Sequence, residues 1–135
     1  MELPHAPAKV WTALTTAEGL AGWFGSSADI DLRPGGLAHL AWATEGASAT
    51  LVVKVVDEPH RFAYTWGIEG LPADDPRRTF VEFVLEPIEA GTRLTVRESG
   101  FAQVPGDVFD QAYKGNDEGW ASELRDLMEY LGAGA

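Results

Sequence analysis

The sequence predicts an α+β fold, in which a curved antiparallel sheet is covered by one long C-terminal helix over an apolar pocket. Two patterns carry this prediction. Between residues 29 and 97, polar and apolar residues alternate in short segments separated by turns, which predicts about five or six hairpin-linked strands with one wet face. Residues 109–131 instead follow the 3.6-residue period of an amphipathic helix, the one element with enough apolar surface to cover the other face.

Two short helices are expected near the start of the chain, where they close one end of the sheet. Pro7 suits the first turn of a helix, because the N–H that proline lacks would have no partner there. The residues that recur at helical spacing behind it are Val10, Trp11 and Leu14. We expect Thr15 and Glu18 to form a capping box that starts the second helix. The apolar side of that helix consists of Leu20, Trp23 and Phe24.

The strands are assigned from the apolar residues that alternate along them. Pro34, Gly35 and Gly36 predict a turn between the first two strands, and Pro59 ends the third strand. The inward-facing residues expected on successive strands are Ile30 and Leu32; Ala38, Leu40 and Trp42; Leu51, Val53 and Val55; Phe62, Tyr64 and Trp66; Val81, Phe83 and Leu85; and Leu94 and Val96.

The C-terminal helix is expected to combine a packing half and a looser half. Its apolar stripe consists of Phe109, Ala112, Tyr113, Trp120, Leu124, Leu127, Met128 and Leu131. Gly115 and Gly119 interrupt the first half, and each costs about 1 kcal/mol relative to alanine in a helix. We therefore expect the leucine-rich second half to dominate stability and the first half to lie over the pocket.

Composition excludes several classes of protein. The 135 residues suit a single domain over residues 1–135, and the 45% hydrophobic content indicates an ordinary globular chain. The net charge is −11 and the ten basic residues are scattered, so we expect no nucleic-acid partner. No apolar run is long enough to predict membrane insertion. The sequence shows no secretion signal and no cysteine, which favours a cytoplasmic location.

The strongest candidate site is an aromatic cluster lining the pocket. The side chains that we expect to bind a ligand are Trp23, Phe24, Trp42, Tyr64, Trp66, Phe83, Glu98, Phe101, Tyr113, Asn116 and Trp120. For the aromatic residues the alternative is plain core packing. For Glu98 the alternative is a solvated strand end, and for Asn116 it is a hydrogen bond to nearby backbone.

No catalytic residue, metal ligand or cofactor is expected. His5, His39 and His60 share neither a helix face nor a close spacing, and there is no thiolate ligand. No serine lies in a Gly-x-Ser-x-Gly elbow.

Several short segments occur in an order that resembles a known superfamily. They are Val10-Trp11-Thr12-Ala13-Leu14-Thr15, Leu20-Ala21-Gly22-Trp23-Phe24, Pro34-Gly35-Gly36, Glu98-Ser99-Gly100-Phe101 and Gly119-Trp120. This set resembles the SRPBCC superfamily, also called START or Bet v 1-like, and within it the AHSA1-like branch named after the C-terminal domain of the activator of Hsp90 ATPase. The resemblance implies a helix-grip fold. It also implies a function among lipid or polyketide carriers, cyclases and dehydratases, hormone receptors or cochaperone parts.

The residues favour a non-catalytic binding protein for a small apolar or aromatic molecule. The alternatives are a cyclase or dehydratase that acts through Glu98, Asn116 or a pocket tyrosine, and a cochaperone-like module that binds a protein partner. An enzyme needs a titratable pocket group with a perturbed pKa, whereas an interaction module needs a large exposed apolar patch.

Overall fold

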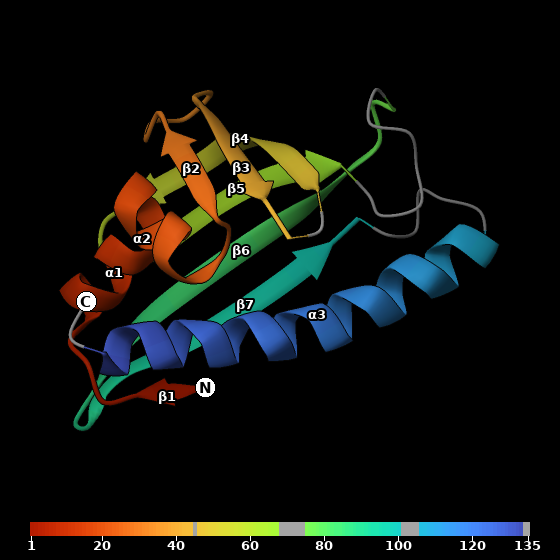
Figure 1. Ribbon diagram of the computed structural model, residues 1–135. Helices are drawn as coiled ribbons and strands as arrows, with labels where there is room; N and C mark the ends of the chain where they lie inside the picture. The colour runs from red at the N-terminus through yellow and green to blue at the C-terminus, as the bar shows by residue number, and fades with distance from the viewer. Residues whose placement is uncertain (45, 68–74, 101–105, 134–135) are drawn as a thin grey trace.

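In the described part of the chain, the backbone forms an antiparallel sheet with three helices, one of them long (Figure 1). The computed structural model describes residues 1–44, 46–67, 75–100 and 106–133, and for residues 106–118 the description covers the backbone alone. In chain order the elements are β1 (Glu2–Leu3), α1 (Pro7–Thr15), α2 (Ala17–Trp23), β2 (Ser27–Ile30), β3 (Leu37–Trp42), β4 (Ala47–Asp57), β5 (Arg61–Gly67), β6 (Arg78–Ile88), β7 (Gly91–Ser99) and α3 (Gly106–Gly132).

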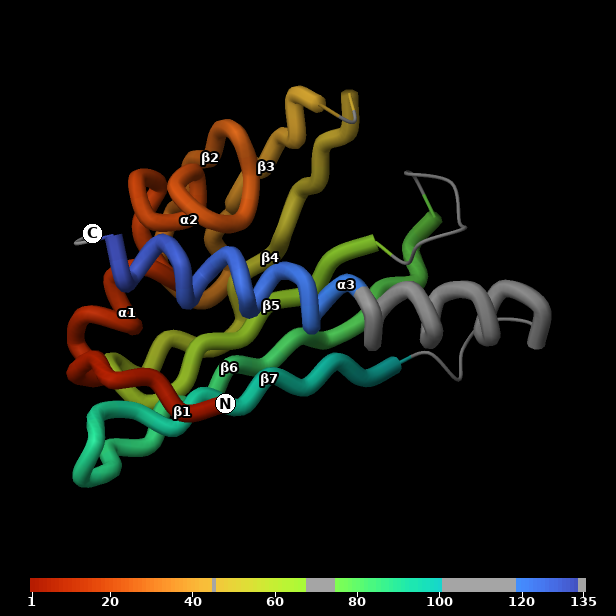
Figure 2. Tube along the Cα trace, turned by 60° about the horizontal axis from the view of Figure 1, so that its bottom comes forward, coloured from red at the N-terminus to blue at the C-terminus, as the bar shows by residue number. Residues whose placement is uncertain are grey.

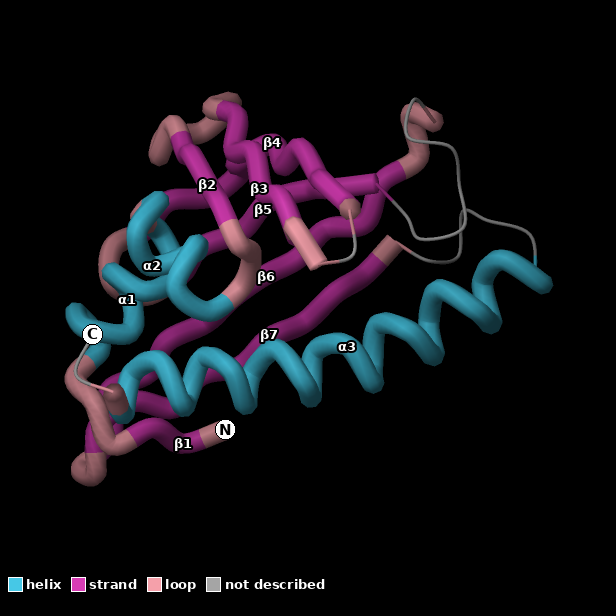
Figure 3. The backbone as a smooth tube through the Cα atoms, viewed as in Figure 1, coloured by secondary structure: helices cyan, strands magenta, loops and turns pink. Residues whose placement is uncertain are grey.

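The seven strands lie in the order β1-β7-β6-β5-β4-β3-β2, and every neighbouring pair is antiparallel. Strands β2 to β7 are therefore sequential neighbours, as the alternating pattern predicted. The short β1 adds an edge strand beside β7. Figure 3 shows α3 running across the sheet, while α1 and α2 gather at the end that the C-terminus of α3 reaches. The predicted α+β architecture is confirmed.

The first two helices meet at two adjacent threonines. Thr15 is the last residue of α1, and its buried hydroxyl donates to the Trp11 carbonyl at 2.8 Å. Thr16 is instead the N-cap of α2, since its hydroxyl oxygen accepts from the Gly19 N–H at 3.0 Å. The predicted capping role of Thr15 is therefore wrong by one residue, because the Thr15 hydroxyl is already hydrogen-bonded within α1 and Thr16 caps α2 instead.

The alternation of the sheet departs from the prediction at two places. A β-bulge shifts the register of β4 against β5 between Val53 and Val55, so that Val56 packs against the core instead of Val55. Strand β2 ends at Ile30, where the chain turns with a hydrogen bond from the Arg33 N–H to the Asp31 carbonyl. Leu32 lies beyond that turn and is exposed, contrary to its expected inward position.

Helix α3 is fastened at its C-terminal end. Leu127 and Leu131 are fully buried, and Lys9 of α1 donates to the Leu131 carbonyl at 3.0 Å. Both views place this end of α3 beside α1 and α2 (Figure 2). Met128, which was expected in the apolar stripe, is 43% exposed. Among the described side chains of α3, Leu127 and Leu131 are buried, and Trp120, Leu124 and Tyr130 are partly buried against the same core.

None of the helices in the described part of the chain is both long and apolar enough to cross a membrane.

Candidate functional site in the aromatic cluster

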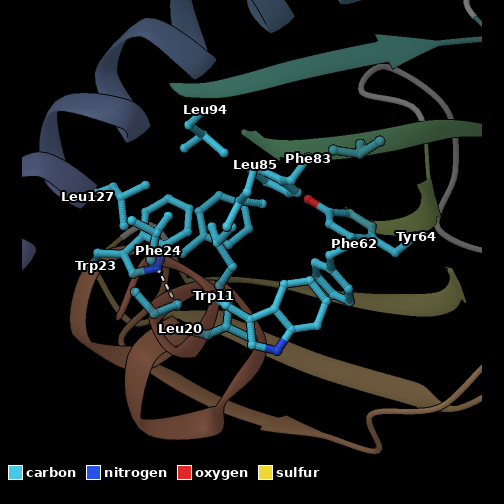
Figure 4. Close-up of a cluster of buried hydrophobic side chains, with 14 of the residues drawn as sticks. Trp11, Leu20, Trp23, Phe24, Phe62, Tyr64, Phe83, Leu85, Leu94 and Leu127 are labelled. Atoms are coloured by element: carbon cyan, nitrogen blue, oxygen red, sulfur yellow. Dashed lines mark hydrogen bonds between the residues drawn. The ribbon is translucent and has the colours of Figure 1, made fainter. Parts of the chain in front are cut away.

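Nine aromatic side chains from the two short helices, the sheet and α3 form one continuous set of ring contacts, here called the aromatic cluster. Its members are Trp11, Trp23, Phe24, Trp42, Phe62, Tyr64, Trp66, Phe83 and Trp120. Figure 4 shows six of them: Trp11, Trp23, Phe24, Phe62, Tyr64 and Phe83. The strand members share one face because the side chains of a strand alternate with a period of two.

Phe24 lies at the centre of the ring contacts in the cluster. It lies at the C-cap of α2, so the end of that helix aims its ring at the sheet. Its ring centroid is 5.5 Å from that of Trp42 in an edge-to-face contact, and 5.7 Å from that of Trp120 in a stacked contact. A third contact, at 5.8 Å, joins it to Trp66. These separations fall in the range in which aromatic pairs attract each other.

Indole N–H groups hold two of the rings in place. Trp23 donates to the Ala13 carbonyl at 2.8 Å, which ties α2 back to α1. Trp42 donates to the carbonyl of Phe24 and so joins β3 to the end of α2. The polar edges of both rings are thereby satisfied, and their apolar faces are left to line the cluster.

Glu98 brings a carboxylate to the far end of the cluster. Its Oε1 accepts from the Trp120 indole at 2.9 Å, and its Oε2 accepts from the Trp66 indole at 2.9 Å. The hydroxyl of the fully buried Thr79 also donates to Oε2. An indole N–H can only donate, so both carboxylate oxygens act as acceptors. Glu98 thus joins β5, β6, β7 and α3 through donors that carry no charge.

Tyr64 presents a second polar group to the cluster. The residue is 2% exposed, and its hydroxyl has no hydrogen-bond partner among the residues whose side chains are described. Figure 4 shows this hydroxyl directed into the cluster. Burial raises the pKa of Tyr64 well above its usual value of 10, and the negative charges of Glu98 and Glu123 raise it further. Tyr64 therefore remains a neutral hydroxyl over the physiological range.

The described side chains leave little free space within this part of the cluster. An apolar cavity of about 10 Å³ is lined by Leu14, Leu20, Trp23, Phe24, Ile30, Leu51, Phe62, Tyr64 and Phe83. That volume is about the size of one water molecule. This cavity is free space that described side chains enclose beside Tyr64, Phe24 and Phe83.

The structure brings together eight of the eleven residues expected to bind a ligand. They are Trp23, Phe24, Trp42, Tyr64, Trp66, Phe83, Glu98 and Trp120. Tyr113 and Asn116 lie on α3 where only the backbone is described, and Phe101 lies outside the described residues.

Sequence reasoning left four polar or aromatic contributors out of the candidate site: Trp11, Phe62, Thr79 and Glu123. Thr79 has the same strand parity as Val81 and Phe83, so the alternation of β6 already placed it inward. Trp11 joins the cluster through an edge-to-face contact with Phe62, 6.3 Å between centroids. Glu123 lies on α3 three residues after Trp120 and is only partly exposed. Nothing in its polar type distinguished it from the solvated side of the helix. No group of three or more described His, Asp or Glu side chains is arranged to hold a metal ion.

Residues 4–132 match the family model described as activator of Hsp90 ATPase homolog 1-like protein (AHSA1). The chain belongs to this AHSA1-like family. The match spans nearly the whole chain, so the helices, strands β2 to β7 and the aromatic cluster all lie within the matched range. The resemblance inferred from the ordered motifs is confirmed.

Solved structures of the same fold agree with this assignment. Protein MLL2253 from Mesorhizobium loti is 27% identical with a TM-score of 0.82, over 98% of this chain and 93% of that one. Protein NE0264 from Nitrosomonas europaea is 26% identical with a TM-score of 0.80, over 98% and 91%. DynU16, a protein in the dynemicin biosynthetic locus, is 24% identical with a TM-score of 0.80, over 99% of this chain and 46% of its own. No curated protein matches the sequence.

Proposed function

We propose that this AHSA1-like domain binds a small apolar or aromatic molecule within the aromatic cluster, between α3 and the sheet. The observation that carries the proposal is the Tyr64 hydroxyl, which is buried, directed into the cluster and without a described partner. Buried polar groups are almost always hydrogen-bonded, and an unpaired one costs about 1–3 kcal/mol. A ligand with a polar atom would supply the missing partner.

The surroundings of Tyr64 suit an apolar ligand. Its ring lies 5.3 Å from Trp66 and 6.2 Å from Phe83, centroid to centroid. Binding sites for small molecules are mostly apolar and aromatic, with a few polar groups that fix orientation. Here those polar groups are the Tyr64 hydroxyl and the Glu98 carboxylate.

We place the entry of the ligand at Trp120. Trp120 is only partly buried, and a Cβ on the glycine before it would meet nothing within 4 Å. The hydrogen bond from Lys9 of α1 to the Leu131 carbonyl lies at the C-terminal end of α3. Displacement of the Trp120 ring would therefore leave that end of the helix in place.

The other two functions have weaker support. The one cluster group with a perturbed pKa is Tyr64, and its shift keeps it protonated rather than poised to exchange protons near neutral pH. An interaction module should expose a large apolar patch. The large apolar side chains that are exposed among the described residues come from separate segments: Met1, Leu32, Leu37 and Met128.

Titration with the neutral apolar dye N-phenyl-1-naphthylamine tests the proposal. We expect saturable binding to the parent protein and altered binding to Trp120→Ala, because that ring contacts Phe24, Trp66 and Phe83. Leu37→Ala is the matched control, since Leu37 is exposed on β3 away from the cluster, and it should bind like the parent.

Native mass spectrometry of protein purified from its own host provides a second readout. We expect a retained small molecule that is lost on denaturation. Absence of any retained mass together with absence of saturable dye binding contradicts the proposed function. Equal dye binding by the parent and Trp120→Ala contradicts the placement of the ligand in the cluster.

A further inference from the structure

The polar end of the aromatic cluster carries a negative charge that no described cation balances. The four ion pairs of the described residues are Arg33–Asp31, Arg61–Glu82, Arg77–Asp75 and Arg93–Glu2, and Glu98 takes part in none of them. Its three donors are two indoles and a threonine hydroxyl, all neutral. A partly buried carboxylate held only by neutral dipoles attracts a cation more strongly than one already paired.

The donors of Glu98 among the described residues leave one of its acceptor positions unused. A carboxylate offers about four acceptor positions. Oε2 accepts from Trp66 and Thr79, whereas Oε1 accepts from Trp120 alone. The unused position on Oε1 lies beside the indole of Trp120, whose ring stacks with that of Trp66 at 5.9 Å. A cation at this position would interact with a carboxylate oxygen and with electron-rich ring faces at once.

Tyr64 is a second and independent pointer to a ligand. Its hydroxyl is buried in the cluster without a described partner. After burial, the negative charge of Glu98 contributes to the raised pKa of Tyr64. A negative charge at one end of an apolar site disfavours fatty acids and other anionic ligands, because like charges repel most strongly where water is excluded.

We propose that the ligand carries a protonated amine on an apolar or aromatic body, with the ammonium group at Glu98 and the body among the rings of Phe24, Trp66 and Trp120. This inference rests on the proposed function and narrows it to one class of ligand. Glu98 supplies charge and orientation, the indole faces stabilise the cation, and the neutral Tyr64 hydroxyl pairs with a polar atom of the ligand body.

Three probes that share one naphthalene body test the inference by calorimetric titration near neutral pH. They are 2-naphthylmethylamine, which is cationic, 2-naphthalenemethanol, which is neutral, and 2-naphthoate, which is anionic. We expect the amine to bind about tenfold more tightly than the alcohol, and the carboxylate to bind most weakly. In Glu98→Gln the amine should lose this preference while the alcohol binds as before.

Glu86→Gln is the matched control. Glu86 is an exposed carboxylate on β6, and removing it lowers the negative charge of the protein by the same amount without touching the cluster. It should keep the preference for the amine. Loss of the preference in Glu86→Gln as well would show that overall charge causes it, and this would overturn the assignment to Glu98.

A measurement on the parent protein avoids dependence on how well Glu98→Gln folds. The five tryptophans give separate indole N–H signals in a ¹H–¹⁵N spectrum. Addition of the amine should shift the signals of Trp66 and Trp120, the two indoles bonded to Glu98, and leave that of Trp11 nearly unchanged. Unmoved Trp66 and Trp120 signals at saturating amine would overturn the inference.

The outcomes separate the two proposals. If none of the three probes binds, and the neutral dye and native mass spectrometry also show no ligand, the proposed function fails and this inference falls with it. If the alcohol or the carboxylate binds as tightly as the amine, the inference alone is overturned and the apolar binding site stands.

Discussion

Glu98 and Tyr64 show how a polar residue within an aromatic cluster gains its properties from its neighbours. Glu98 is tied to two indoles and a buried threonine, so its carboxylate has a fixed place between the sheet and α3. Tyr64 sits two strands away on β5 with a hydroxyl that nothing described satisfies. Glu98 is held by three hydrogen bonds, whereas the Tyr64 hydroxyl is buried without a described hydrogen-bond partner.

Replacing Tyr64 by phenylalanine should stabilise the protein without ligand. Tyr64→Phe removes a buried hydroxyl that has lost its water without gaining a described partner, so we expect a gain of about 1 kcal/mol in the free energy of unfolding. Tyr130→Phe is the control, because Tyr130 is only partly buried and its hydroxyl is not among the buried groups without a partner, so its change should be close to zero. Urea unfolding measures both. A loss of stability in Tyr64→Phe would show that the hydroxyl is hydrogen-bonded in solution.

The same substitution should change the response to alkaline pH. The pKa of Tyr64 is raised in the folded protein above its usual value of 10, by burial first and then by Glu98 and Glu123. The folded state therefore holds its proton longer than the unfolded state, and this contribution to stability is complete below about pH 10 and lost as pH rises through the folded pKa. The stability of Tyr64→Phe should fall less steeply above pH 10 than that of the parent. Parallel curves would contradict the raised pKa.

Two glycines in helices should respond in opposite directions to replacement by alanine. At Gly19 in α2, a Cβ would lie 2.6 Å from the Ala13 carbonyl oxygen and 2.7 Å from its Cα, where α2 crosses α1. Since backbone atoms cannot move aside cheaply, Gly19→Ala should cost about 2 kcal/mol or more. At Gly119 in α3 a Cβ meets nothing within 4 Å, so Gly119→Ala should gain about 1 kcal/mol. Chemical unfolding of both variants is the measurement, and a stabilising Gly19→Ala would contradict the close crossing.

Adjacent residues near the end of α3 should differ sharply in their contribution to stability. Leu127 is fully buried, so Leu127→Ala should cost about 2–5 kcal/mol. Met128 is 43% exposed, and Met128→Ala should cost less than about 1 kcal/mol. Trp120→Ala should lose less than its size suggests, because Trp120 is only partly buried. Thermal melts of the three variants test this, and an unchanged melting temperature for Leu127→Ala would contradict the role of this end of α3.

The whole molecule carries a net charge of −11, and its described residues form four ion pairs. Repulsion among unpaired carboxylates should therefore lower stability at low salt. Raising NaCl from about 0.01 M to about 1 M shortens the Debye length from about 30 Å to about 3 Å, so the free energy of unfolding in urea should rise. Near pH 4.5, the pI of the sequence, the same salt change should have much less effect. Lower stability in salt at neutral pH would contradict this view.

The sequence could predict the architecture and most of the candidate site, because both depend on local periodicity. Alternation along the strands placed Tyr64, Trp66 and Phe83 on the covered face of the sheet. The helical period placed Leu127 and Leu131 on the buried side of α3. The predictions fail where a single residue changes the local repeat. The bulge after Val53 turns Val56 instead of Val55 toward the core. Helix α1 extends to Thr15, so the N-cap of α2 is Thr16.

The amino-acid sequence by itself determined the helix-grip arrangement. Amphipathic periods and turn residues act over a few neighbouring positions, and so they define the helices and strands. The long helix and the sheet then bury their apolar faces against each other. Only the tertiary structure decided the chemistry of the site. The bonds of Glu98 to Trp66 and Trp120 join residues 32 and 22 positions apart, and the ring of the buried Tyr64 contacts that of Phe83 on the neighbouring strand β6. Such contacts depend on how the sheet curves beneath α3, and no local pattern encodes the distance between side chains that only folding brings together.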